Sequence, residues 1–180
     1  IIFSGKAEME DERAAGLSRM SSSGRKDNTG VGLQVLDKGQ TVDVHAVGSR
    51  LYGTSFSIKV PQNMKIVLKN DATVLQGNVE VNNMKNELEI SVSHNPVKLM
   101  NDSGPVNVKS LYGTIEAVFS SGLKGPISLV SVYGLVDATL PGSVKANLDM
   151  STSFGKLYAS DSFNIVIDPV KEVVNKDEKY

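Results

Sequence analysis

The chain has 180 residues, with 19 basic and 20 acidic side chains, no cysteine and two histidines. The balanced charge argues against a basic surface for nucleic acid or anionic lipid, and no apolar run reaches the roughly 18 residues of a membrane span. The lack of cysteine excludes disulfides, thiolate metal ligands and a cysteine nucleophile.

Residues 1–30 are predicted to form an irregular N-terminal segment. They contain the acidic cluster EMEDER and the stretch SSSGRKDNTG, which is rich in residues that favour turns. KDNTG offers side-chain oxygens that suit calcium, but it lacks the spacing of an EF-hand and is predicted to be a turn. Because the chain starts with Ile1 rather than Met, we expect a mature or truncated piece.

From Val31 onward, apolar and polar residues alternate with the period of two that is typical of β-strands. VGLQVL and TVDVHAV read as two strands joined by a turn at Lys38 and Gly39, and SFSIKVP and KIVLK continue the alternation. Residues 31–168 are therefore predicted to be a β-strand-repeat domain. Residues 169–180 are predicted to be a charged C-terminal tail.

A repeat of 21 residues dominates the second half of the chain. Three segments align without a gap: residues 104–124, 125–145 and 146–166. Gly113, Gly134 and Gly155 share one column, and Asn95 and Gly77 continue this column upstream in steps of 18 residues. Asparagine replaces glycine most readily where φ is positive, so we expect a left-handed turn in this column.

After each residue of this column, two apolar positions flank a polar or amphipathic one. The apolar pairs are Val79 and Val81, Val97 and Leu99, Ile115 and Ala117, Val136 and Ala138, Leu157 and Ala159; the residues between them are Glu80, Lys98, Glu116, Asp137 and Tyr158. Strand alternation then points the apolar pairs inward and the residues between them outward.

Such a repeat cannot bury its apolar face alone and has to stack on its neighbours. The pattern therefore predicts an all-β fold, a β-helix-like solenoid of 18–21-residue repeats with parallel strands about 4.8 Å apart. An antiparallel β-sandwich is the alternative, because it also has short strands separated by turns. A sandwich, however, has no reason to keep an ungapped 21-residue register.

The segments VSVYGLVDATLPGSVKANLDMSTSFGKLYA and GPVNVKSLYGTIEAVF resemble the bacterial adhesin family of β-strand-repeat domains. RAAGLSRMSSSGRKDNTGVGL is similar to the region that precedes the repeats in that family. The resemblance implies a β-helix-like body in an exported or envelope protein of a Gram-negative bacterium, located in the periplasm, on the outer membrane surface or outside the cell. It implies adhesion or surface structure, and it carries over no catalytic residue.

One outward column holds the best group of carboxylates in the sequence. Its members are Glu80, Lys98, Glu116 and Asp137. β-Helical polysaccharide lyases and glycosidases use exposed carboxylates of this kind, so one hypothesis is that the column forms a carbohydrate-active site. The alternative is a solvated charge ladder with a structural role alone, in which each surface pair contributes about 0–1 kcal/mol to stability.

Tyr112, Tyr133 and Phe154 form an aromatic column, preceded by His94 and Gln76. Rings stacked at strand spacing form either a strip that binds sugars or a ladder that stabilises the turns.

The sequence predicts no catalytic residue, no metal ligand and no cofactor, since G-x-S-x-G, P-loop and G-x-G-x-x-G motifs are absent. We therefore expect a non-enzymatic exported or cell-surface domain, an adhesin or an envelope structural protein. Its expected partner is a glycan or a cell-surface protein. The alternatives are a carbohydrate-binding or carbohydrate-active β-helix, and a scaffold that self-associates through the unpaired strands at its ends.

Overall fold

The computed structural model describes residues 1–5, 13, 16–17, 20–47, 55–71, 77–163 and 165–166. The chain divides into two compact units, Ile1–Pro141 and Gly142–Tyr180. Each of the twelve regular elements within the described ranges is a β-strand, which confirms the all-β prediction. Gln76 of the aromatic column and the predicted tail at 169–180 lie outside the described residues.

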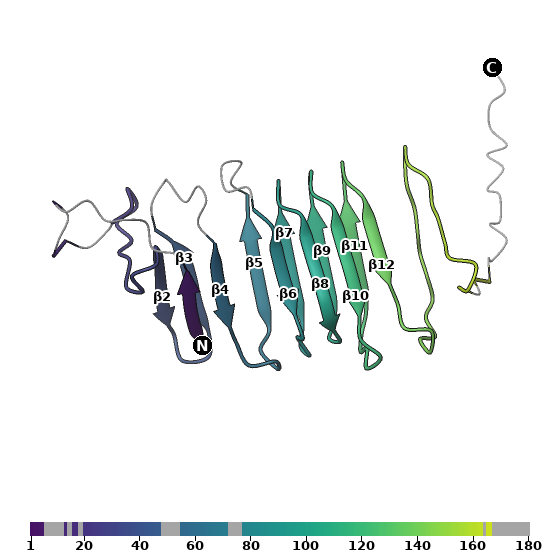
Figure 1. The fold of residues 1–180 in the computed structure, drawn as a ribbon, viewed down its shortest axis with the longest axis horizontal. Helices are drawn as coiled ribbons and strands as arrows, with labels where there is room; N and C mark the ends of the chain where they lie inside the picture. The colour runs from purple at the N-terminus through teal and green to yellow at the C-terminus, as the bar shows by residue number, and fades with distance from the viewer. Residues whose placement is uncertain are drawn as a thin grey trace, which may run out of the picture. The chain divides into compact units, whose positions relative to one another are not determined.

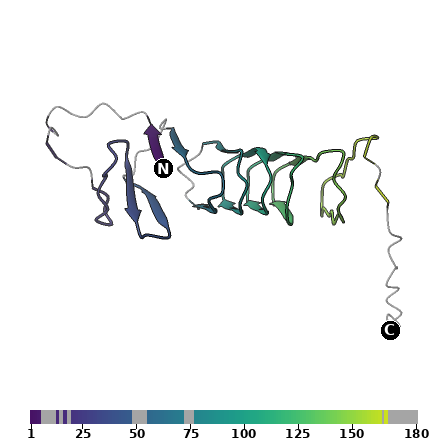
Figure 2. The same cartoon turned by 90° about the horizontal axis from the view of Figure 1, so that it is seen from below.

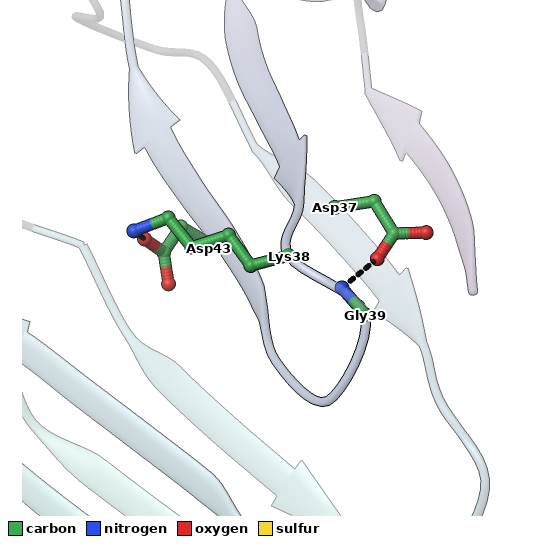
Figure 3. Close-up of polar contacts among 4 residues, drawn as sticks. All are labelled: Asp37, Lys38, Gly39 and Asp43. Carbon is green, nitrogen blue, oxygen red and sulfur yellow. Dashed lines mark hydrogen bonds and ion pairs between the residues drawn. The ribbon is translucent and has the colours of Figure 1, made fainter.

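The first strands of the chain pair in the antiparallel direction. Strand β2 (Leu33–Asp37) and strand β3 (Val42–Ala46) form the predicted hairpin. Gly39 has a φ of 81°, and its amide donates to the Asp37 carboxylate at 2.8 Å (Figure 3). The Lys38 ammonium pairs with the carboxylate of Asp43 across the same turn and lowers the pKa of that carboxyl.

Strand β1 (Ile2–Gly5) corrects the prediction that residues 1–30 are irregular throughout. It pairs with strand β4 (Phe56–Lys59), so that Phe3 lies opposite Ile58. The sequence did not reveal this strand, because its partner is more than fifty residues away and no repeat links the two segments.

The next eight strands form four coils, each with one strand in each of two parallel four-stranded sheets (Figures 1 and 2). They are β5 (Ile66–Asn70), β6 (Val79–Asn82), β7 (Leu88–Val92), β8 (Val97–Asp102), β9 (Val106–Ser110), β10 (Ile115–Phe119), β11 (Ile127–Ser131) and β12 (Val136–Thr139). One sheet has the order β5-β7-β9-β11 and the other β6-β8-β10-β12. Parallel pairing between coils confirms the β-solenoid and excludes the antiparallel sandwich for residues 66–139.

The core lies between the two sheets and consists of the inward residues of the strands. Its most deeply buried members include Leu88, Ile90, Leu99, Val108 and Ile115. Each aliphatic side chain buried in this way contributes about 1.5–3 kcal/mol to folding. Because a coil covers its neighbour on each side, this core is continuous along the stack.

Burial of the predicted inward positions depends on their place in the stack. Ile115 and Ala117 of β10 are 0% and 2% exposed, whereas Val136 of β12 is 39% exposed and Ala138 is also exposed. Strand β10 has a neighbour on both sides, but β12 is the last strand of its sheet in this unit. The alternation therefore determines whether a side chain points inward or outward, and the neighbouring coils determine how deeply it is buried.

Close packing and not a positive φ requires glycine at Gly113 and Gly134 of the glycine column, which corrects the expectation from the sequence. A Cβ atom on Gly113 would lie 2.1 Å from the carbonyl oxygen of Asn95, and one on Gly134 would lie 2.4 Å from that of Gly113. Neither glycine has a positive φ. The left-handed non-glycine residues of the described part are Asn83 and Asn101, with φ of 61° and 60°.

The second unit carries the last repeat of the sequence. Its described residues, 142–163 and 165–166, include no strand. A local turn is nevertheless formed, in which the Gly155 amide donates to the Thr152 hydroxyl at 2.9 Å. Most apolar and aromatic side chains of this repeat are exposed, with Leu157 at 57% and Phe154 fully accessible, whereas Phe163 and Ile165 are half-buried.

Candidate functional site

The outward charge column is aligned in the structure as the repeat predicts. Glu80 lies opposite Lys98, Lys98 opposite Glu116, and Glu116 opposite Asp137 on strands β6, β8, β10 and β12. All four residues are exposed. Parallel strands lie about 4.8 Å apart, so the column places one charged group per coil on the outer face of one sheet.

An open depression of about 200 Å³ lies at the start of strands β6, β8 and β10. Its lining consists of Asn78, Glu80, Pro96, Val97, Lys98, Thr114 and Glu116. The lining combines carboxylate and amide oxygens, a hydroxyl and one ammonium group. This set can hydrogen-bond to a polyhydroxylated or charged ligand from one side.

Electrostatic interactions within the column are weak. The ion pairs of the described part join Lys38 to Asp43 and Lys65 to Glu87, and none of them involves the column. Solvent-exposed charges of this kind contribute about 0–1 kcal/mol. Asp137 has the like charge of Glu116 directly opposite it, which is mildly unfavourable.

The aromatic column forms a stack of rings in the first unit. His94 and Tyr112 have ring centroids 4.8 Å apart, and Tyr112 and Tyr133 have centroids 5.1 Å apart with an interplanar angle of 11°. Phe154 belongs to the second unit. Because the ring of Tyr112 has a neighbour on each face, it presents its edge and hydroxyl to a ligand. This geometry favours a stabilising ladder over a flat sugar platform.

A row of buried and half-buried polar groups stabilises the corner beside these rings, and the sequence analysis did not predict it. The Ser110 hydroxyl accepts a hydrogen bond from the Gly113 amide at 2.9 Å, and the Ser131 hydroxyl donates to the Gly113 carbonyl at 2.9 Å. Asn95 donates through its side-chain amide to the Gly77 carbonyl at 2.7 Å. The available signal was a Ser or Thr three residues before each glycine of the repeat, as in Ser110 and Gly113.

Asp102 is the second group that the sequence reading missed. The alternation of β8 places Val97 and Leu99 inward, but Asn101 adopts a left-handed conformation. The pairing with β10 shifts there, so that Phe119 lies opposite Asp102 rather than Asn101. This bulge turns the Asp102 side chain into the core, where it is 0% exposed.

The Asp102 carboxylate is only partly compensated by hydrogen bonds. Its Oδ1 atom accepts from the Met84 amide at 2.6 Å, whereas Oδ2 is buried and has no hydrogen-bond partner in the described part of the chain. Burial raises the pKa of this carboxyl to about 6, against the opposing effect of the Met84 and Met100 amides. An acidic group without a countercharge is thus held among apolar side chains.

The predicted turn at KDNTG is formed, and its oxygens are occupied by the chain itself. The Asp27 carboxylate accepts from the amides of Thr29, Gly30 and Gly32 and from the Thr29 hydroxyl. Burial opposes ionisation of this carboxyl, but the four hydrogen bonds outweigh it and lower the pKa. Within the described ranges, no three His, Asp or Glu side chains gather as a metal site would require.

In the part that the structure describes, no helix has the length and apolarity to cross a membrane. The chain matches no protein-family model, no curated protein and no solved structure.

Proposed function

We propose that this chain is a non-enzymatic domain of an exported or cell-surface protein, an adhesin or an envelope structural component. The observation that carries the proposal is the outward column from Glu80 to Asp137, which keeps strict register across four strands and is exposed along its length. A stack of coils with such a column presents one outward side chain per coil to a partner, at a regular spacing. The resemblance of the repeats to bacterial adhesin domains supports the same role.

The arrangement of the candidate groups suits binding better than catalysis. They lie on the outer face of a sheet, one per strand, about 4.8 Å apart. Catalysis generally requires groups that converge on one reacting bond in a site from which water is excluded. A row of exposed charges instead meets an extended partner, such as a glycan or a polar protein surface.

A glycan array with the full chain tests the binding proposal. We expect a variant that combines Lys98→Gln and Glu116→Gln to lose most of the binding that the wild type shows. The matched control is Lys109→Gln, which removes an exposed charge from β9 in the other sheet. Equal loss in both variants would contradict a role for the column. Protease digestion of intact and permeabilised cells tests the location, and protection in intact cells would argue against surface exposure.

A carbohydrate-active enzyme is the second candidate, because Glu116 and Asp137 are direct neighbours on β10 and β12. Retaining glycosidases hold their two carboxyl groups about 5–5.5 Å apart, which is close to the spacing of adjacent strands. A screen on polysaccharides separates the candidates. Turnover that Asp137→Asn abolishes would overturn the non-enzymatic proposal, whereas binding without turnover supports it.

Self-association through strand edges remains a prediction from the sequence. In the first unit, β11 and β12 are the last strands of their sheets and present unpaired backbone groups at that edge of each sheet. Light scattering over a range of concentrations tests it. Growth of particles with concentration would support the prediction, and a constant monomer mass would contradict it.

A further inference from the structure

Asp102 occupies a core position that apolar residues fill in the adjacent coils. The equivalent residue one coil earlier is Met84, which follows the left-handed Asn83 as Asp102 follows Asn101. The two asparagines are joined by a side-chain hydrogen bond of 2.6 Å. One coil later, Phe119 pairs in register with Asp102. The backbone thus places the Asp102 carboxylate in the core between the positions of Met84 and Phe119.

We propose that Asp102 makes the stability of the coil stack depend on pH, so that the coils are held more firmly in acid and loosen as this carboxyl ionises. A neutral carboxylic acid is tolerated in an apolar column much better than a carboxylate is, because ionisation requires hydration or a countercharge. Here Oδ2 has neither a hydrogen-bond partner in the described residues nor exposed surface. The proton that leaves on ionisation passes to water.

Charged groups on the surrounding elements do not compensate this carboxylate. Those on β6, β8 and β10 and in their corners that are exposed are Glu80, Lys85, Lys98, Glu116 and Lys124. Glu87, in the corner between β6 and β7, is half-buried and pairs with Lys65. In the opposite sheet, Glu89 and Lys109 take the outward positions between buried neighbours on β7 and β9. His94 has its ring in the aromatic stack.

The direction of the effect follows from the pKa, which rises from 3.8 to about 6 on folding. Between these values the folded chain keeps a proton that the unfolded chain has lost. The contribution of Asp102 to stability is therefore greatest below about pH 4, falls as the pH rises to about 6, and is level above that value.

Urea unfolding of the full chain, followed by circular dichroism from pH 4 to pH 8, tests the proposal. We expect the unfolding equilibrium constant of the wild type to rise by about tenfold to a hundredfold over this range. Asp102→Asn keeps the acceptor for the Met84 amide and removes the charge, so this rise should largely disappear and the variant should exceed the wild type in stability at pH 8. Asp137→Asn, the exposed control, should keep the wild-type profile.

An Asp102→Asn variant with the same pH dependence as the wild type would overturn the proposal. The two proteins differ at residue 102 alone, so the difference between their pH profiles isolates Asp102. Should the variant fail to fold, the carboxyl carbon of Asp102 in the wild type can be titrated by NMR. A midpoint near pH 6 supports the proposal, and a midpoint below pH 4.5 would overturn it.

Discussion

Residues 104–124 and 146–166 carry the same repeat but differ in structure. The first segment forms β9 and β10, whose inward residues are at most 5% exposed. The described residues of the second segment include no strand, and Leu157 is 57% exposed. Both segments nevertheless form the same turn, in which a glycine amide donates to the hydroxyl of Ser110 or Thr152 at 2.9 Å.

This difference separates what a repeat specifies locally from what it gains by stacking. The turn needs only four consecutive residues, so it forms wherever its sequence occurs. A strand of the solenoid needs hydrogen-bond partners in the adjacent coils, and its apolar side chains need those coils to cover them. We therefore expect equivalent substitutions in the two segments, or in the middle and last coils, to have unequal effects.

The largest expected effect comes from a charge in the middle of the stack. Ile115→Asp should unfold the first unit, at a cost of more than about 4 kcal/mol, because it buries an unpaired carboxylate at a position that is 0% exposed. Val136→Asp, one coil later and 39% exposed, should cost about 1–2 kcal/mol. Urea denaturation measures both, and equal costs would contradict the dependence on neighbouring coils.

The glycine column should show the next largest contrast. Gly113→Ala places a Cβ atom 2.1 Å from the Asn95 carbonyl and forces two coils apart, which we expect to cost about 3 kcal/mol. In Gly155→Ala, the atom within 3 Å of the new Cβ is the Thr152 hydroxyl, which can rotate away. That variant should lose about 1 kcal/mol or less. Thermal melts of both proteins make the comparison, and a larger loss at Gly155 would contradict it.

The turn hydroxyls should give a smaller contrast. Ser110→Ala leaves the amide of the buried Gly113 without its acceptor, at an expected cost of about 1–2 kcal/mol. The amide of the exposed Gly155 can turn to water instead, so Thr152→Ala should cost less than about 0.5 kcal/mol. Urea denaturation measures both losses. Equal losses in the two variants would show that burial does not determine how much this hydrogen bond contributes to stability.

The smallest effect is expected on the outer face. Asp137→Ser should change stability by less than about 0.5 kcal/mol, because the residue is exposed and its neighbour Glu116 has the same charge. Denaturation at low and high salt should give the same result. A loss larger than that of Val136→Asp would mean that the inward and outward faces of β12 are exchanged.

Much of the solenoid was predictable because apolar and polar residues alternate along the strands of each coil. Val97, Leu99, Ile115 and Ala117 were assigned inward from this pattern, and all are buried. The charge column followed from the same alternation, since register and face are linked in a strand. Gly113 and Gly134 were placed in one column from the sequence, although close packing rather than φ explains why these two are glycine.

The features that the sequence did not reveal depend on breaks in this alternation or on distant partners. Asn101 adds one residue to β8, so a strict period of two assigns Asp102 to the wrong face. Strand β1 needs β4, which lies far away in the chain. The aromatic column was visible in the sequence, but the interplanar angles that turn ring faces toward each other were not.

Parallel pairing between coils also has a mechanical consequence. The hydrogen bonds that join one coil to the next point along the stacking direction in both sheets. A force applied along that direction pulls each bond lengthwise and can open the joints one coil at a time. A force applied along the strands loads all the bonds of a joint in shear at once. The four-coil stack should therefore resist tension along its strands better than tension along its axis.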